Sequence, residues 1–210
     1  MAHLKLQPPG KIIAVGLNYR SHAVELNMAV PDEPVLFMKP PSAVIAAGEA
    51  IILPPSSGQV DYEAELAVVI GKTAWGVDVG EAADIVMGYT CANDVTARDL
   101  QKLDGQWTRS KSFDTFCPLG PWVESVAPAP DSLVELLLNG ELRQSAPVSD
   151  MIFSPLELVA FISGVMTLER GDVILTGTPP GVGALKAGDE VTVRIEGIGE
   201  LVNDVVLSGA

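Results

Sequence analysis

Glycine and proline are spread so densely along this chain that long helices have little room to form. The 210 residues include 20 glycines and 16 prolines, with short runs of valine, isoleucine and leucine between them. Glycine and proline punctuate regular elements, and short apolar runs bounded by turn residues are typical of β-strands. The pattern therefore predicts a mainly β protein with a few helices.

The length and composition predict one folded domain. Hydrophobic residues make up 48% of the sequence and charged residues 19%, so a chain of this size can bury a substantial core. We find no internal repeat and no boundary to a second domain. We expect a single domain over residues 1–210, in which the proline-broken residues 16–40 form either a lid on the core or a plain connector.

The charge balance limits the partners. The formal net charge is -14, and only 13 lysines and arginines are spread along the chain, which argues against nucleic acid. A small anionic substrate would need a metal ion or a few placed cations to offset the long-range repulsion. The chain starts without a signal-peptide core, and no apolar run approaches the roughly 20 residues of a membrane span. We therefore expect a cytoplasmic protein without membrane contact.

The periodicity of apolar residues places the elements. Strands are expected over residues 11–16, 35–38, 43–53, 60–70, 133–138, 141–144 and 173–176, with two more between 189 and 206. Helices are expected over residues 18–27, 81–88 and 155–166, and from Asn93-Asp94 onward. Asn18 is a candidate N-cap for the first of these helices. Asn139-Gly140 is a strong hairpin turn.

The strand expected over residues 60–70 carries an unusual acidic face. Asp61, Glu63 and Glu65 are two residues apart, so their side chains point the same way. Converging carboxylates suit a hard divalent cation, although a strand face turned toward water is the alternative. Asp94 is a third carboxylate for such a site, or else the N-cap of the following helix.

Histidine and cysteine contribute little to metal binding. His3 and His22 are the two histidines, so a site built from several histidines cannot form. Cys91 and Cys117 form no C-x-x-C pair, and we assign them no chemistry. Oxygen-only ligation favours Mg²⁺, Mn²⁺ or Ca²⁺.

Two further segments carry polar groups that are placed for chemistry. Residues 176–183, Thr-Gly-Thr-Pro-Pro-Gly-Val-Gly, lack the Gly-Lys-Ser/Thr of a P-loop and the third glycine of a Rossmann fingerprint. Their backbone N–H groups and threonine hydroxyls suit a carboxylate or carbonyl, with a simple tight turn as the alternative. His22 and Glu25 are three residues apart and share a helix face.

Taken in order, these segments resemble the fumarylacetoacetate hydrolase family, in particular its short single-domain members, which include acylpyruvases and oxaloacetate decarboxylases. The resemblance runs from Gly16 to about Val206. It is carried by Gly16-Leu-Asn-Tyr with His22 and Glu25, Pro34-Val-Leu-Phe-Met-Lys-Pro40, Asp61-Tyr-Glu-Ala-Glu65, Asp94-Val-Thr-Ala-Arg-Asp99, Lys111-Ser-Phe-Asp114, Asn139-Gly-Glu-Leu-Arg-Gln144 and Ile174-Leu-Thr-Gly-Thr-Pro-Pro-Gly-Val-Gly183.

The resemblance assigns a metal site. It implies that Glu63, Glu65 and Asp94 bind Mg²⁺ or Mn²⁺, with Ca²⁺ as a substitute in crystals. Three carboxylates leave about three octahedral positions for a chelating 2-oxo acid and a water. Asp61 and Asp99 are left as supporting or structural acids.

The resemblance also implies catalytic and substrate-binding roles. Lys111 would add positive charge beside an enolate, and Glu25 would orient the His22 imidazole to take a proton from water. The alternatives are a solvated lysine and a surface helix pair. The residues implied to contact the substrate are Arg98, Gln101 and Thr178.

The implied fold is mainly β with some helix, an α+β fold of layered, rolled sheets, usually found as a homodimer. The implied activity is metal-dependent cleavage of a C–C bond in a small 2-oxo or 2,4-dioxo acid through a metal-bound enolate, as in acylpyruvate or fumarylpyruvate hydrolysis or oxaloacetate decarboxylation. One alternative is an isomerase or decarboxylase of diacids such as 2-hydroxyhepta-2,4-diene-1,7-dioate, in aromatic catabolism. A diacid would want a second cation at the far end of the pocket. A remote alternative is a metal-binding oligomer without turnover.

Overall fold

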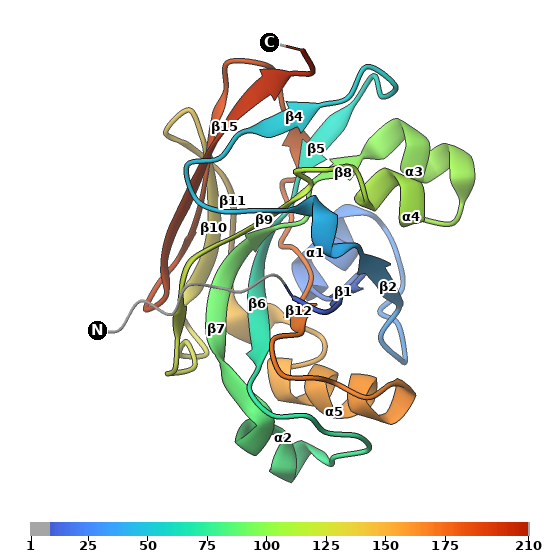
Figure 1. The fold of residues 1–210 in the computed structure, drawn as a ribbon, viewed down its shortest axis with the longest axis vertical. Coiled ribbons are helices and arrows are strands. Elements are labelled where there is room, and N and C mark those ends of the chain that lie inside the picture. Colours follow the sequence, from blue (N-terminus) through green and yellow to red (C-terminus); the bar gives the residue numbers. More distant parts are fainter. Residues whose placement is uncertain (1–8, 210) are drawn as a thin grey trace.

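The computed structural model describes residues 9–209, and strands dominate these residues (Figure 1). The strands are β1 (Ile12–Val15), β2 (Leu36–Lys39), β3 (Val44–Ile45), β4 (Ile51–Leu53), β5 (Val60–Tyr62), β6 (Ala64–Ile70), β7 (Val86–Asn93), β8 (Thr96–Ala97), β9 (Cys117–Glu124), β10 (Leu133–Leu138), β11 (Glu141–Pro147), β12 (Val173–Leu175), β13 (Gly183–Ala184), β14 (Glu190–Ile195) and β15 (Gly199–Leu207). The α-helices are α1 (Arg20–Glu25), α2 (Val79–Ile85), α3 (Arg98–Asp104), α4 (Thr108–Lys111) and α5 (Pro155–Val165). Two single 3₁₀ turns cover Pro41–Ala43 and Val148–Asp150.

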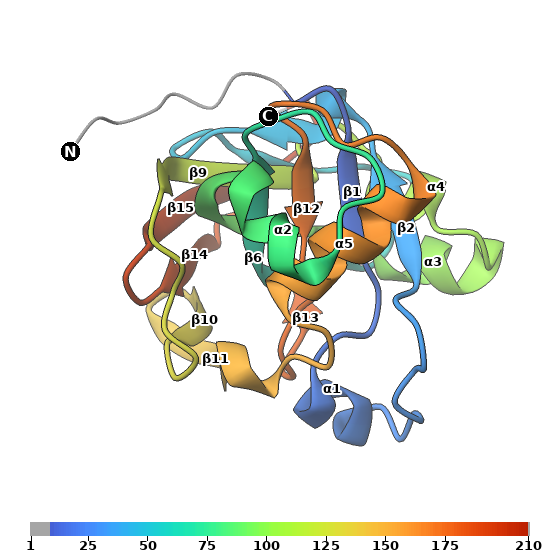
Figure 2. The same ribbon diagram turned by 90° about the horizontal axis from the view of Figure 1, so that it is seen from below.

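The strands form three sheets. The seven-stranded sheet has the order β2-β1-β12-β6-β7-β9-β3, the five-stranded sheet β11-β10-β14-β15-β4, and the three-stranded sheet β13-β5-β8. Strands β6 and β7 curve through the middle of the molecule, and α2 and α5 lie together at one end of it (Figures 1 and 2). The predicted mainly β, α+β architecture of rolled sheets is confirmed.

Alternation along β6 separates two hydrophobic cores. Leu66 and Val68 point into the larger core, which also takes side chains from the five-stranded sheet and from α5. Ala67 and Val69 point to the opposite face, into a smaller core. Every residue of β6 is buried. Glu65 near the start of this strand is therefore an acidic group inside the protein, and it requires polar partners there.

The prediction of a helix that starts at Asn93-Asp94 was wrong. Asn93 is the last residue of β7, and α3 begins only at Arg98. The Asn93 side chain is used in tertiary structure, because its Oδ1 accepts a hydrogen bond of 2.9 Å from the backbone N–H of Glu63. Asp94 is consequently not a helix cap. The helix predicted over residues 81–88 was also misplaced, since α2 ends at Ile85 and β7 follows at once.

Asn18 does not cap α1 as the sequence suggested. The helix begins at Arg20, and Tyr19 occupies the N-cap position without a side-chain cap. The Nδ2 of Asn18 donates instead to the carbonyl oxygens of Phe153 and Thr176, at 3.0 and 2.7 Å. The side chain therefore joins three segments that are distant in sequence. By contrast, α5 begins with a capping box formed by Ser154 and Glu157, an arrangement that stabilises the start of a helix.

Residues 16–40 contain both a peripheral and an integral part. Strand β2 is the edge strand of the seven-stranded sheet and pairs with β1. Helix α1 and the exposed residues that follow it lie outside the sheets (Figure 2). Among residues 9–209 no helix is long and apolar enough to cross a membrane. The cytoplasmic location stays a prediction.

Candidate active site

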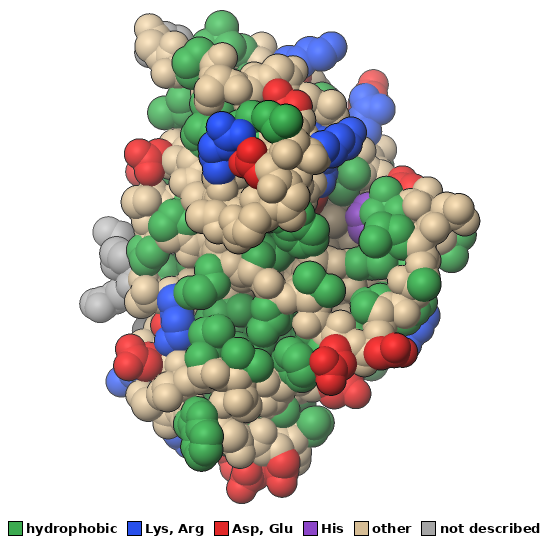
Figure 3. All heavy atoms as spheres, turned by 90° about the vertical axis from the view of Figure 1, so that its right-hand side faces the viewer, with side chains coloured by type: hydrophobic (Ala, Val, Ile, Leu, Met, Phe, Trp, Pro, Cys, Tyr) green, Lys and Arg blue, Asp and Glu red, His purple; other side chains and the backbone are tan. Residues whose placement is uncertain are grey.

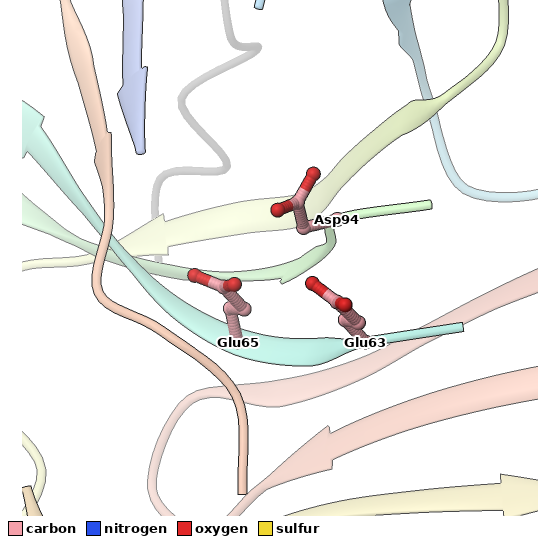
Figure 4. A group of neighbouring side chains, drawn as sticks. All are labelled: Glu63, Glu65 and Asp94. Carbon is pink, nitrogen blue, oxygen red and sulfur yellow. The ribbon is translucent and has the colours of Figure 1, made fainter. Parts of the chain in front are cut away.

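Three buried carboxylates meet where β5 and β7 end and β6 begins (Figure 4). Glu63 lies in the one-residue break between β5 and β6, Glu65 is the second residue of β6, and Asp94 directly follows β7. One oxygen from each carboxylate lies within 4.8 Å of the others. The backbone N–H of Asp94 donates to the Glu63 carbonyl at 2.8 Å, so pairing of neighbouring strands holds the acids together.

Three cations surround this cluster. The Lys111 Nζ donates to Glu63 at 2.7 Å and to Asp94 at 2.6 Å. Lys39, itself only 1% exposed, donates to the other Asp94 oxygen at 2.6 Å. Arg98 donates from Nη2 to Glu63 at 2.5 Å. Buried charges persist when they are paired in this way.

Glu63 and Glu65 differ in their electrostatic surroundings. Burial raises the pKa of Glu63, but the charges of Lys111 and Arg98 outweigh it and lower the pKa to about 2. Glu65 accepts one hydrogen bond, of 2.6 Å, from the backbone N–H of Gly177. Burial, followed by the charges of Asp94 and Glu63, raises the pKa of Glu65 well above its usual value. Among residues 9–209, Lys111 and Lys39 form ion pairs with Glu63 or Asp94, and no lysine or arginine forms one with Glu65.

This shortage of positive charge fits a divalent cation. A buried set of three carboxylates is a donor set that suits a hard ion such as Mg²⁺, Mn²⁺ or Ca²⁺. Asp61, which the strand pattern placed on the same face, lies apart from the cluster. It accepts a hydrogen bond of 2.8 Å from the Nε of Arg98 and so helps to orient that guanidinium.

The loop after β12 lies against Glu65. Gly177 has a φ of +95°, and a Cβ there would lie 2.7 Å from the Cβ of Asn18, so glycine is required. Thr178 accepts a hydrogen bond of 2.8 Å from the Nε2 of Gln144. Its hydroxyl keeps its own proton, which can be donated to a ligand. The Oε1 of Gln144 accepts from the backbone N–H of Ala64 at 2.9 Å and so links this loop to β6.

His22 and Glu25 are hydrogen-bonded on α1. The distance between His22 Nδ1 and Glu25 Oε2 is 2.7 Å. An ionised carboxylate can only accept, so Nδ1 carries the proton and Nε2 is the free nitrogen. The Oε1 of Glu25 accepts from the backbone N–H of Gly181 at 3.0 Å. His3, the other histidine, lies outside the described residues.

One cavity of about 330 Å³ joins these groups. It is lined by six of the nine site residues expected from the sequence, namely His22, Glu63, Arg98, Gln101, Lys111 and Thr178. The other three contact members of this set or lie beside them. Phe37 and Trp107 form an apolar wall, with their ring centroids 5.4 Å apart.

Two polar residues of this region escaped the sequence analysis. Lys39 stands at the end of a predicted strand before Pro40-Pro41, where a lysine is normally exposed, and no local pattern indicates its burial. Gln144 lies in the strand after the Asn139-Gly140 turn, where it resembles a solvated side chain. Only the family-like segments that contain them drew attention to either position.

A comparison of the sequence with protein-family models matches residues 11–206 to the family described as fumarylacetoacetate (FAA) hydrolase C-terminal. The chain belongs to the fumarylacetoacetate hydrolase family. This membership confirms the resemblance that the ordered motifs indicated.

Similar family members come from archaea, bacteria and animals. An uncharacterized protein of Archaeoglobus fulgidus is 58% identical over 94% of this chain and 79% of its own length. The mitochondrial oxaloacetate tautomerase FAHD2B of Bos taurus is 46% identical over 94% of this chain and 67% of its own length.

Solved structures of family members have the same fold. The 5-carboxymethyl-2-hydroxymuconate delta-isomerase of Mycobacterium smegmatis superposes with a TM-score of 0.91 at 46% identity, covering 97% of this chain and 81% of that one. The 2-hydroxyhepta-2,4-diene-1,7-dioate isomerase of Mycobacterium marinum gives a TM-score of 0.90 at 45% identity, covering 97% and 77%.

Proposed function

We propose that this protein is a Mg²⁺- or Mn²⁺-dependent enzyme that transfers a proton at the carbon next to the keto group of a small 2-oxo acid. The observation that supports this most is that Glu63 of the buried acidic cluster and His22 of the His22–Glu25 pair line one cavity. A bound ion would polarise the keto group and stabilise the enolate that forms when a proton leaves or a C–C bond breaks.

In this proposal Glu63, Glu65 and Asp94 hold the ion. One oxygen of each carboxylate already lies within 4.8 Å of the others, so the fold holds the three ligands together. Lys111 donates to two of these carboxylates, and the third proton of its ammonium group is available for a substrate oxygen. The positive charge of Lys111 thus lies where negative charge develops.

His22 acts as the base in this proposal. Its Nδ1 proton is held by Glu25, which leaves Nε2 to take a proton from the substrate. Thr178 and Gln101 orient the substrate oxygens. The Gln101 Oε1 accepts a hydrogen bond of 2.6 Å from Nη1 of Arg98. The side-chain N–H groups of Gln101 are then left to donate to the substrate.

The names of the relatives favour proton transfer, because two of those compared are isomerases and one is a tautomerase. Cleavage of a C–C bond, as in an acylpyruvate hydrolase or oxaloacetate decarboxylase, is the second candidate. It is supported by the same base, since a histidine oriented by a carboxylate can also activate water.

A substrate panel tests the proposal. Acetylpyruvate, fumarylpyruvate, oxaloacetate and a hydroxymuconate-type diacid would each be assayed with Mg²⁺, with Mn²⁺ and after metal removal. We expect metal-dependent exchange of the proton next to the keto group, detected by NMR in D₂O, with at least one diacid. Identical behaviour of the metal-free and metal-loaded proteins with every acid would contradict an enzymatic role and favour a metal-binding oligomer.

We also propose that the protein forms a homodimer and that residues 16–40 include a lid. Figure 3 shows hydrophobic side chains gathered on the side where α3 and β2 lie. The proposed lid is α1 with the residues that follow it, where the apolar side chains of Val24, Met28 and Val30 are 80%, 57% and 53% exposed. Light scattering at micromolar concentration should give twice the 22.0 kDa of one chain. A mass of one chain at all concentrations would contradict the dimer.

A further inference from the structure

Lys39 contacts the acidic cluster from inside the protein. It is the last residue of β2, and its side chain is fully buried. Its Nζ donates to Oδ1 of Asp94 at 2.6 Å and to the backbone carbonyl of Val95 at 3.2 Å. Phe37, two residues earlier on the same face of the strand, lines the cavity, whereas Lys39 is not among its lining residues. A bound substrate would therefore not touch Lys39.

The two oxygens of the Asp94 carboxylate are held by different lysines. Oδ1 accepts from Lys39, and Oδ2 accepts from Lys111 at 2.6 Å. The backbone of Asp94 is fixed as well, because its N–H donates to the Glu63 carbonyl and its own carbonyl accepts from the Thr96 hydroxyl. Lys111 lines the cavity, so its ammonium group can turn toward a substrate. Lys39 is enclosed and stays on Oδ1.

The ammonium group of Lys39 determines which Asp94 oxygen suits a metal ion. The distance between Mg²⁺ or Ca²⁺ and a ligand oxygen is about 2.0 to 2.6 Å. A divalent ion bound to Oδ1 would then lie within about 5 Å of the Lys39 Nζ, where two positive charges in a buried site repel each other. Ligation through Oδ2 alone leaves Oδ1 to Lys39 and avoids this arrangement.

The number of oxygens that a carboxylate supplies separates the candidate ions. Ca²⁺ takes about six to eight oxygens and accepts both oxygens of one carboxylate, whereas Mg²⁺ demands a nearly octahedral set, which also suits Mn²⁺. We propose that Lys39 is a positioning residue that reserves Oδ1 of Asp94, limits this ligand to one oxygen, and so favours Mg²⁺ or Mn²⁺ over Ca²⁺. The inference rests on the proposed function, because it needs the acidic cluster to be the metal site.

Equilibrium binding of two ions tests this role without requiring turnover. Calorimetry would give the Kd of Ca²⁺ and the Kd of Mn²⁺ for wild type, for Lys39→Met and for the control Lys11→Met. Methionine is a long apolar side chain without the charge or the N–H groups of lysine. Lys11 pairs with Asp172, which is not a proposed metal ligand, so the control also removes a paired lysine. Loss of a positive charge raises the affinity for both ions, so the ratio of the two Kd values reports the coordination.

We expect Lys39→Met to lower the ratio of the Ca²⁺ Kd to the Mn²⁺ Kd about tenfold, the scale of one contact between charged groups, and Lys11→Met to leave this ratio unchanged. An unchanged ratio in Lys39→Met would overturn the role of Lys39 while leaving the proposed metal site intact. Failure of wild type to bind Mn²⁺ would overturn both.

Crystal structures of the wild-type protein loaded with each ion provide a second measurement, which does not depend on the folding of a variant. We expect Oδ2 as the one Asp94 oxygen within about 2.6 Å of the ion, with the Lys39 ammonium group still on Oδ1. Ligation of Ca²⁺ or Mn²⁺ by Oδ1 of Asp94, alone or together with Oδ2, would overturn the proposal even if the metal binds to the acidic cluster.

Discussion

Replacing Glu65 by glutamine should abolish metal binding without destabilising the metal-free protein. Burial and the charges of Asp94 and Glu63 raise the pKa of Glu65, so its ionised form costs folding free energy at every pH above about 4.5. Glutamine keeps an oxygen for the Gly177 N–H and removes the charge. Replacing a residue that only hydrogen-bonds to a metal ligand typically costs about 10- to 100-fold in metal affinity. Losing a ligand itself should therefore cost more than about 100-fold.

Glu63→Gln is the informative control for this prediction. The pKa of Glu63 is lowered to about 2 by Lys111 and Arg98, so its charge stabilises the fold above about pH 4.5, and this stabilisation is lost as the pH falls toward 2. At pH 7.5 this substitution leaves two cations short of a partner and should cost on the order of 3 kcal/mol.

Thermal melting and Mn²⁺ calorimetry at pH 7.5 would separate the two variants. Both should lose Mn²⁺ binding, but the metal-free Glu65→Gln protein should melt at or above the wild-type temperature and Glu63→Gln below it. Wild-type Mn²⁺ affinity in either variant would refute the assignment of the acids. Equal destabilisation of both metal-free variants would refute the electrostatic contrast between them.

Replacing His22 by glutamine should lower kcat by about 10²- to 10⁴-fold, the usual contribution of a general base, and leave Mn²⁺ affinity unchanged. The imidazole lines the cavity and is held by Glu25 rather than by the acidic cluster. Steady-state kinetics with the best substrate of the panel, combined with Mn²⁺ calorimetry, would measure both effects.

Glu25→Gln is the companion variant for the base. An amide retains the size of the side chain but cannot stabilise the imidazolium that forms during proton transfer, so we expect a loss of kcat that is smaller than in His22→Gln. If His22→Gln retained more than about a tenth of the wild-type kcat, far above the residual rate of an enzyme without its base, another residue would have to be the base.

The sequence predicted that Glu63 and Glu65 lie close together, because this depends only on the two-residue period of a strand, but Asp61 of the same predicted face lies apart from the cluster. Glu63 and Glu65 were found in this way, and Asp94 was found as the polar residue where an apolar run stops. The same local logic misplaced the start of α3. Asn93 and Asp94 have side chains that often cap helices. The Asn93 side chain instead accepts a hydrogen bond from the backbone N–H of Glu63.

The groups that complete the site could not be predicted from local patterns. Lys39 is buried because Asp94, 55 positions later in the chain, provides its partner. Gln144 is oriented by Ala64 and by Thr178, from two different parts of the fold. A periodic pattern reports which face of an element is apolar, but it does not report which polar residue of another element meets that face.

The two oxygens of Glu25 have a consequence for the order of events in a catalytic cycle. One oxygen holds the imidazole of His22 and the other holds the backbone N–H of Gly181. Movement of α1 away from residues 176–183 would break the second bond and release the carboxylate that orients the base. In the proposed mechanism, the base would therefore be fully positioned only while α1 contacts the loop that carries Gly181, which would place proton transfer before the opening that releases the product.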